Sequence, residues 1–304
     1  MTVKSWKRIG RVFTSEGQFP WMHTHAAVPI AEHLSEDIFK IYFSSRDQSN
    51  RSYTGFVVID LQNPDEVLEL SSHPVLSPGA LGTFDDSGAM GSWLLSDGNK
   101  RYLYYIGWNL GVTVPFRNSI GLAVSENGEP FRRVGEGPIL DRTLAEPHFC
   151  ASCAVIKEAG LFKMWYLSCL GWCGDKPQPQ HRYHIKYADS VDGIVFDRSG
   201  VIAVDLEGPD EFAISRPSII RDEGKLKMWY SYRGPYYRIG YAESVDGGPF
   251  IRRDHFLGLD VSGSGWDSDM VEYPYVFSHQ GQLFMLYNGN GYGLSGFGLA
   301  TLSS

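Results

Sequence analysis

The chain has 304 residues, of which 43% are hydrophobic, and this length is sufficient for one large β domain with a substantial core. Its formal net charge of −8 argues against nucleic acid or an anionic membrane surface as a partner. No apolar run reaches membrane-spanning length, and the N-terminal segment MTVKSWKRIGRVF lacks the apolar region of a signal peptide. We therefore expect a cytoplasmic protein.

The first predicted strand, Trp6–Phe13 (WKRIGRVF), is similar to the outer strand of a later repeat (FRRVGEGP). The last repeat, Glu272–Ser304, shows three strands and lacks an outer strand of its own. We predict that the N-terminal strand supplies the missing one, which removes an exposed sheet edge. In that arrangement Ile9 and Val12 pack beside Gly296–Leu302.

Between these two ends the sequence repeats itself. KMWY at Lys163–Tyr166 recurs at Lys227–Tyr230, and Ile239–Asp246 (IGYAESVD) matches Ile185–Asp192 (IKYADSVD) and Ile120–Asn127 (IGLAVSEN). Four strands in each unit, repeated about every 55–65 residues, are typical of a β-propeller. The repeats begin near His23, Asp85, Phe149, Ser215 and Met270. The sequence therefore predicts an all-β, five-bladed β-propeller, with residues 1–304 as a single domain and the N-terminal strand closing the last blade.

In such a fold the first strand of each blade lines the central channel. The start of that strand and the loop between the second and third strands lie at the same end of the channel, which we call the polar face. The loops of the other face are plain turns such as KEAG and RDEG, so we expect the ligand site at the polar face. The strand starts carry His23, His25, Asp85, Asp86, Glu146, His148, Arg216, Asp267, Asp269, Glu272 and Tyr273. The loops carry Arg46, Arg51, Trp108, Asn109, Arg117, Trp172, His181, Arg182, His184, Arg233, Tyr236, Tyr237, Asn288, Asn290 and Tyr292.

Five blades with polar channel mouths resemble the five-bladed glycoside hydrolase clan of families 43, 32 and 62, with the family 130 phosphorylases as relatives. The resemblance covers nearly the whole chain. It implies cleavage of a glycosidic bond, with an Asp of the first blade as base, an Asp of the second blade, and a Glu of the third blade as acid. Asp85 and Asp86 match the second blade. The first blade offers His25 and no carboxylate, and Glu146 lies in the loop that enters the third blade.

Two carboxyl groups about 6.5–9.5 Å apart would support an inverting glycosidase. We expect Glu146 or Glu272 as the acid and Asp85 or Asp86 as the base or as a pKa-setting partner, although the Asp pair could instead cap a turn. Trp108 and Trp172 are candidates for stacking on sugar rings, the alternative being packing between blades. The predicted substrate-binding residues are His25, Trp108, Arg216, Arg233, Asp269, Tyr273, Asn288 and Tyr292.

Arginines are numerous on this face of an acidic chain. Some will pair with the nearby carboxylates, and a surplus would imply an anionic ligand such as an acidic sugar, a sugar nucleotide or inorganic phosphate. Phosphate would favour a phosphorylase, which needs one acid and no carboxylate base.

The four cysteines, Cys150, Cys153, Cys169 and Cys173, have a C-x2-C and C-x3-C spacing that could hold zinc. Free thiols and a disulfide are the alternatives, so a metal site stays open, and no cofactor is expected.

The leading expectation is a glycoside hydrolase-like, inverting enzyme acting on a small soluble glycoside or glycoconjugate precursor. The alternatives are a phosphorylase or an enzyme acting on an anionic sugar derivative, and a sugar-binding propeller without catalysis. In each case the partner is a small carbohydrate or an anionic sugar derivative.

Overall fold

A computed structural model describes residues 5–174 and 179–302. More than half of these residues lie in strands, and the helix found among them, α1 (Asp254–Leu257), has four residues. In the described part of the chain no helix has the length and apolar character needed to cross a membrane.

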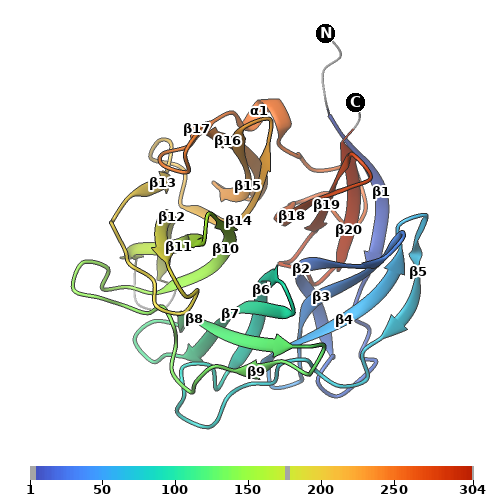
Figure 1. The fold of residues 1–304 in the computed structure, drawn as a ribbon, viewed down its shortest axis with the longest axis horizontal. Helices are drawn as coiled ribbons and strands as arrows, with labels where there is room; N and C mark the ends of the chain where they lie inside the picture. The colour runs from blue at the N-terminus through green and yellow to red at the C-terminus, as the bar shows by residue number, and fades with distance from the viewer. Residues whose placement is uncertain (1–4, 175–178, 303–304) are drawn as a thin grey trace.

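The strands of the described chain form one four-stranded sheet and two eight-stranded sheets (Figure 1). Each eight-stranded sheet consists of two antiparallel groups of four strands joined by a single parallel bridge, and we call each group of four a unit. Within each unit consecutive strands are antiparallel, as expected for strands joined by short turns. Unit 1 contains β2 (Thr24–Ser35), β3 (Ile38–Arg46), β4 (Ser52–Asp60) and β5 (Asn63–Leu70), and unit 2 contains β6 (Gly88–Asp97), β7 (Lys100–Leu110), β8 (Phe116–Glu126) and β9 (Arg132–Arg133). Unit 3 contains β10 (Cys150–Glu158), β11 (Leu161–Cys173), β12 (Gln180–Ser190) and β13 (Ile202–Val204), and unit 4 contains β14 (Ala213–Asp222), β15 (Lys225–Arg233), β16 (Tyr237–Ser244) and β17 (Ile251–Arg252). Unit 5 contains β18 (Glu272–His279), β19 (Gln282–Asn288), β20 (Phe297–Leu302) and β1 (Trp6–Phe13).

The first strands of the units form a ring around the centre of the molecule. β2, β6, β10, β14 and β18 contact one another in cyclic order, and β18 contacts β2 to complete the circle (Figure 1). This arrangement is that of a β-propeller.

Each junction in the ring is held by a side chain of one unit that accepts a backbone N–H of the next inner strand. Because a buried N–H needs a partner, these bonds fix how the inner strands sit beside one another. The five bonds are Gly91 N–H to Thr54 Oγ1, Cys153 N–H to Ser92 Oγ, Arg216 N–H to Ser152 Oγ, Val276 N–H to Ser218 Oγ, and Val28 N–H to Asn288 Oδ1.

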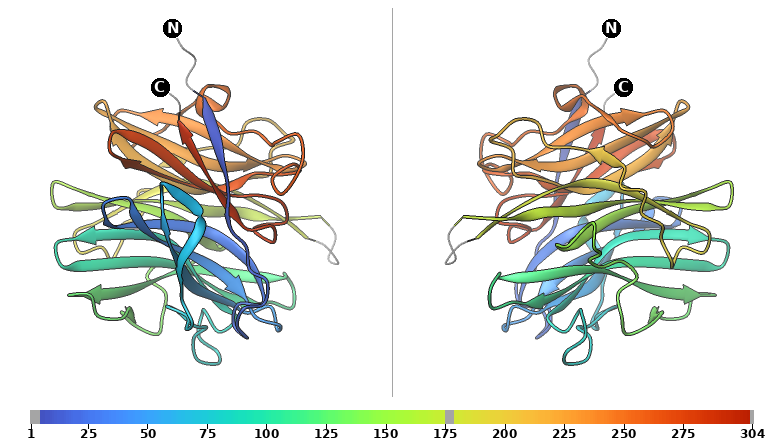
Figure 2. Two further views of the ribbon diagram at one scale, coloured as in Figure 1. Left: turned by 90° about the vertical axis from the view of Figure 1, so that its right-hand side faces the viewer. Right: turned by 90° about the vertical axis from the view of Figure 1, so that its left-hand side faces the viewer.

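The predicted closure by the N-terminal strand is confirmed. β1 pairs antiparallel with β20, so the two ends of the described chain lie side by side (Figure 2). Val12 is buried as predicted, but the expectation for Ile9 is wrong: the register shifts between Arg8 and Gly10, and Ile9 is 43% exposed. A bulge places an extra residue in one strand and turns its side chain away from the expected face. The inward anchor is instead Trp6, which packs edge-on to Trp229 and donates its indole N–H to Leu257 O.

The tryptophans of the repeated KMWY segments are core residues, as expected. Trp165 and Trp229 are fully buried, and their indole N–H groups donate to the carbonyls of Gly247 and Leu257. These bonds satisfy the one polar atom of a large apolar side chain.

Candidate functional site

Unit 5 presents a buried carboxyl group at the polar face. Glu272 is the first residue of β18 and pairs with Asn288 at the end of β19. Its side chain is fully buried, and neither Oε atom has a hydrogen-bond partner. A buried carboxylate without donors is strongly disfavoured, so the group favours its neutral form. Burial therefore raises the pKa of Glu272 well above its usual value, and the nearby Arg233 guanidinium and Tyr292 backbone N–H only weaken this effect.

Aromatic hydroxyl groups and an arginine surround this acid. The Arg233 guanidinium lies 5.3 Å from the centre of the Tyr237 ring, and the Tyr237 and Tyr183 hydroxyl groups are hydrogen-bonded to each other. The Tyr237 ring lies 6.2 Å from the Tyr273 ring and 6.1 Å from the Tyr292 ring. Burial raises the pKa of both Tyr237 and Tyr273 well above the usual value, so these hydroxyl groups stay protonated and can donate hydrogen bonds. We call this set the Glu272 cluster: Glu272, Tyr273, Arg233, Tyr183, Tyr237 and Tyr292.

A strained backbone conformation positions part of the cluster. Tyr273 has φ of 55°, Tyr292 has φ of 59°, and the inner strands of units 1 and 4 have the same left-handed feature at Val28 and Arg216. Non-glycine residues rarely adopt this conformation, and it is retained where surrounding structure enforces it, often at functional sites. In β18 the Tyr273 N–H donates to Ser231 Oγ of the neighbouring unit, and this bond stabilises the left-handed conformation of Tyr273.

Unit 1 adds His25 and Arg46 at the flank of the cluster. His25 Nδ1 lies 2.9 Å from Thr24 Oγ1, and burial together with Arg46 lowers the pKa of His25 to about 4. The ring is therefore neutral at pH 7 and able to accept a proton. Arg46 Nη1 donates to Asn50 Oδ1 at 3.2 Å, and burial lowers the pKa of Arg46.

The predicted catalytic residue Asp85 occupies a different environment. Its Oδ2 accepts Tyr105 Oη at 3.1 Å and forms an ion pair with Arg133 at 2.8 Å, while Thr83 donates to Oδ1. Among the bonds and ring contacts of the described residues, none joins Asp85 to the Glu272 cluster. The neighbouring Asp86 accepts the Gly82 N–H and the Asn109 amide, as expected for a carboxylate that caps a turn.

The carboxylate of Glu146 likewise forms a hydrogen bond and ion pairs within the protein. It accepts Tyr166 Oη at 3.0 Å and forms ion pairs with Lys186 at 3.2 Å and Arg198 at 3.3 Å. Burial would raise the pKa of Glu146, but Lys186, Tyr166 and Arg198 outweigh it and lower the pKa. An ionised, ion-paired carboxylate is poorly suited to donate a proton at neutral pH.

Three of the predicted substrate-binding residues contact the protein itself. Asn288 is fully buried and uses its amide on the backbone of Val28, Ala26 and Gly296. Trp108 lies against Gly88, where an added Cβ would be 2.1 Å from its Nε1. Asp269 is exposed, and its backbone N–H and carbonyl contact Asn290 and Arg238.

Arg216 projects into the channel centre and links units. From β14 its Nη1 donates to the carbonyl of Ser92 in unit 2, and its Nη2 donates to that of Pro29 in unit 1 at 3.0 Å. The side chain is 1% exposed, and burial lowers its pKa to about 10. Its two bonds to carbonyls of other units make it a cross-link of the channel.

The cysteines are free thiols in the structure. Cys150, Cys153 and Cys169 are buried and Cys173 is exposed, and no disulfide joins them. Within residues 5–174 and 179–302, no group of three or more His, Cys, Asp or Glu side chains is arranged to hold a metal ion.

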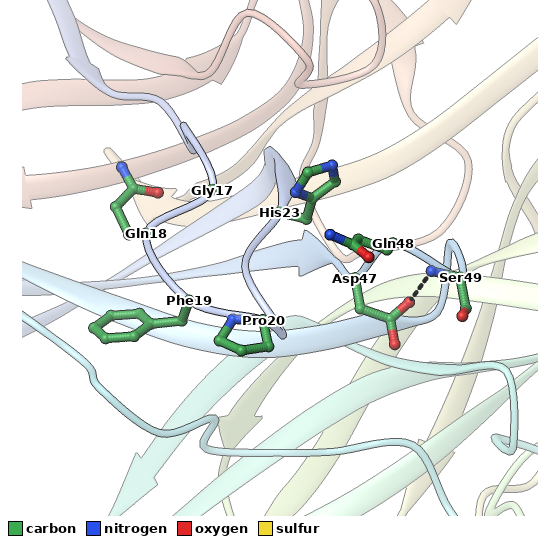
Figure 3. A pocket seen from close by; sticks show the side chains of 8 residues that line it. All are labelled: Gly17, Gln18, Phe19, Pro20, His23, Asp47, Gln48 and Ser49. Carbon is green, nitrogen blue, oxygen red and sulfur yellow. Dashed lines mark hydrogen bonds between the residues drawn. The ribbon is translucent and has the colours of Figure 1, made fainter.

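The structure has two surface cavities that no residue of the Glu272 cluster lines. One, of about 680 Å³, includes Glu146, Lys186 and Arg198 in its lining, and the other, of about 380 Å³, lies between the segments 17–23 and 47–49. Figure 3 shows His23 and Asp47 at the smaller cavity, where Asp47 accepts the Ser49 N–H. Neither cavity is lined by Asp85, Asp86, Arg216 or Glu272.

Comparison with solved structures identifies the class of the fold. A thermostable family-43 glycoside hydrolase is 19% identical, with a TM-score of 0.64 over 92% of this chain and 88% of that chain. A glycosyl hydrolase from Bacteroides ovatus is 13% identical, with a TM-score of 0.72 over 99% and 94% of the two chains. A family-32 β-fructofuranosidase from Bombyx mori is 15% identical, with a TM-score of 0.62 over 95% and 62%. The chain therefore has the β-propeller fold found in glycoside hydrolases.

Sequence comparison places the chain in a family. No protein-family model matches it. Two uncharacterised proteins of Mycobacterium tuberculosis, Rv1502 of strain H37Rv and MT1551 of strain CDC 1551, are each 44% identical over 300 residues, which is 99% of this chain and 100% of theirs. The chain belongs to the same family as these two proteins.

Sequence reasoning did not place Tyr183 in the site, and it named Tyr237 only as a loop residue. Both lie at or near the start of the third strand of a unit. Tyr237 is the first residue of β16, and Tyr183 is the fourth residue of β12. Runs such as YYRIGYA and HRYHIKYA contain aromatics on both sides of the strand start, so spacing alone does not distinguish a site residue from a core residue.

Proposed function

We propose that the protein is a carbohydrate-active enzyme that cleaves a glycosidic bond at the polar face, with Glu272 as the general acid. In this proposal the five units are the blades of one five-bladed propeller spanning residues 1–304. The observation that carries the proposal is the fully buried, unpartnered carboxyl group of Glu272 among protonated tyrosines. A general acid must hold its proton until the leaving oxygen arrives, and a raised pKa serves this purpose.

The remaining groups of the cluster fit binding and orientation. Tyr273 and Tyr292 offer ring faces to a sugar and hydroxyl groups to its oxygens. The buried Tyr237 ring lies 6.2 Å and 6.1 Å from these two rings and supports Arg233. Arg233 adds donors beside the acid. Glu272 is fully buried, so the substrate reaches it when Tyr292 moves aside. Tyr292 is 43% exposed in a loop whose Gly291, Gly293 and Gly296 all have positive φ.

Hydrolysis also needs a group that accepts a proton from water. His25 lies at the start of the first strand of unit 1 and is neutral at pH 7 because its pKa is lowered to about 4. We assign the base to His25 rather than to Asp85 or Asp86, whose carboxylates are held by Arg133 and Asn109. An inverting outcome is expected, because an imidazole that activates water forms no covalent glycosyl intermediate.

A second candidate is phosphorolysis of the same bond. Arg46 and Arg233 take part in none of the ion pairs of the described residues, and phosphate would satisfy them. Phosphate is itself the nucleophile, so this reaction needs the acid and no protein base.

The test is turnover of a panel of aryl and methyl glycosides by wild type, Glu272→Gln and His25→Ala, with and without phosphate. Loss of the acid should reduce kcat about 10²–10⁴-fold on methyl glycosides, and less on nitrophenyl glycosides, whose leaving group needs little protonation. Turnover in water that needs His25 supports the hydrolase, and turnover that requires phosphate supports the phosphorylase. Sugar binding with no turnover of any substrate would contradict the proposed enzyme activity. Full activity of Glu272→Gln would contradict the role of Glu272 as the acid.

A further inference from the structure

Two arginines occupy equivalent positions on either side of unit 5. Arg46 is the last residue of β3 and pairs with Thr24, the first residue of β2. Arg233 is the last residue of β15 and pairs with Ala213, the first residue of β14. Because β18 lies between β14 and β2 in the ring, Arg46 and Arg233 stand at strand ends in the two units that flank β18.

Electrostatic coupling agrees with this placement. Arg233 acts on Glu272, and Arg46 acts on the adjacent Tyr273. The two residues at the start of β18 therefore each lie within range of one arginine.

The protein supplies no counter-charge for these arginines. Two arginines near the same face are paired, Arg51 with Asp47 and Arg238 with Asp260. Arg182 and Arg216, like Arg46 and Arg233, form no ion pair in the described chain, but both donate to backbone carbonyls. Arg46 and Arg233 form no ion pair in the described chain, and Glu272, the carboxyl group nearest to Arg233 in this cluster, is held neutral by burial. A half-buried guanidinium loses hydration, and the Tyr237 ring under Arg233 compensates this only in part.

A second observation points into the same space. Both Oε atoms of Glu272 lack a partner although the residue is fully buried, and the great majority of buried polar atoms in proteins are hydrogen-bonded. Glu272 therefore lacks an acceptor for its proton, and Arg46 and Arg233 lack an anion. One bound ligand with an anionic group would satisfy both.

We propose that Arg46 and Arg233 bind an anionic group, a carboxylate or a phosphate, of the ligand that reaches Glu272. The substrate is then an acidic glycoside, or inorganic phosphate is the second substrate. The choice of a glycoside rests on the proposed function, whereas the anion site does not. Guanidinium groups suit both anions because they donate paired, parallel hydrogen bonds.

The experiment is a calorimetric titration with inorganic phosphate, glucuronate and glucose at constant ionic strength. The variants are Arg46→Met, Arg233→Met and, as the matched control, Arg51→Met, which removes an arginine of the same face that already has Asp47. Wild type should bind at least one of the anions at least about tenfold more tightly than glucose, and the first two variants should lose about tenfold, or about 1.4 kcal/mol, each. The Arg51 variant should bind like wild type.

The anion that binds identifies the source: phosphate alone points to phosphorolysis, and glucuronate to an acidic sugar. Arg46→Lys and Arg233→Lys, which keep the charge, serve if the Met variants unfold, and they should bind anions less tightly than wild type. Equal affinity of wild type for glucose and both anions, no binding of either anion, or unchanged anion binding in the Arg46 and Arg233 variants would overturn the inference. Glu272→Gln separates it from the proposed function, because that variant should keep the anion site while losing turnover.

Discussion

Tyr105 donates its hydroxyl group to Asp85, twenty residues earlier in the chain, and the same twenty-residue relationship joins Tyr166 to Glu146 and Tyr287 to Asp267. In each case a cation completes the set, namely Arg133, Lys186 with Arg198, or Arg8. Unit 4 has a variant in which Tyr230 bonds to Asp254 and Arg252 pairs with Asp254 and Glu211. Unit 1 has Phe43 at the tyrosine position, which offers no hydroxyl group. A carboxylate that recurs with the same partners in several units has a structural explanation.

Replacing Asp85 with Asn should therefore reduce stability more than it reduces the chemical step. It leaves the partly exposed Arg133 guanidinium without its carboxylate, and losing a charge-assisted hydrogen bond of this kind costs about 1–3 kcal/mol. The check is the denaturant midpoint of the variant together with kcat of its folded fraction. Asp86→Asn, whose carboxylate caps an exposed turn, is the control and should lose much less. A normal midpoint with kcat lowered by orders of magnitude would restore Asp85 as a catalytic residue.

Replacing Trp6 with Ala should strongly destabilise the closed ring. Trp6 packs on Trp229 and donates to Leu257 O, and truncation of a buried tryptophan costs about 3–5 kcal/mol. Ile9→Ala, on the same strand, should change stability by no more than about 0.5 kcal/mol because Ile9 lies at the bulge and is exposed. Urea denaturation of both variants tests this, and equal losses would contradict the register of β1.

Replacing Arg216 with Met should also destabilise the protein. The carbonyls of Ser92 and Pro29 would lose their donor inside the channel, and each buried unsatisfied group costs about 1–3 kcal/mol. Arg216→Lys should recover part of the loss, since an ammonium group can reach one carbonyl. A Met variant with wild-type stability and weakened ligand binding would show instead that Arg216 binds the ligand, as the sequence suggested.

The stability of the protein should carry a pH signature of Glu272. Because its folded-state pKa is raised, the folded protein retains this proton above the pH at which the unfolded chain releases it. The contribution is favourable below the unfolded pKa of about 4.3 and is progressively lost as pH rises toward the folded pKa. The wild-type Tm should therefore fall relative to that of Glu272→Gln between pH 4 and neutral pH. A difference in Tm that does not depend on pH would show that Glu272 is ionised in the folded state.

The sequence by itself determined the repeat and therefore the fold. The recurrence of KMWY and of the IGYAESVD-type strand predicted four-stranded units, and the similarity of WKRIGRVF to an outer strand predicted the closure that β1 and β20 form. Both are local patterns, since strand periodicity and turn residues are read from neighbours in the chain. The bulge that exposes Ile9 was not readable, because a register shift depends on the partner strand.

Only the tertiary structure separated the candidate carboxylates. Asp85, Glu146 and Glu272 all stand near strand starts in the sequence. Asp85 and Glu146 meet a tyrosine and a cation from later strands, whereas Glu272 forms no ion pair and no hydrogen bond with a side chain in the described chain. The tertiary structure also separated the arginines. Arg216 donates to backbone carbonyls 124 and 187 residues away in the chain, whereas Arg46 and Arg233 form no ion pair in the described chain. The charge state of a side chain is set by burial and by partners that are distant in the chain, and neither is encoded in the spacing of residues along a strand.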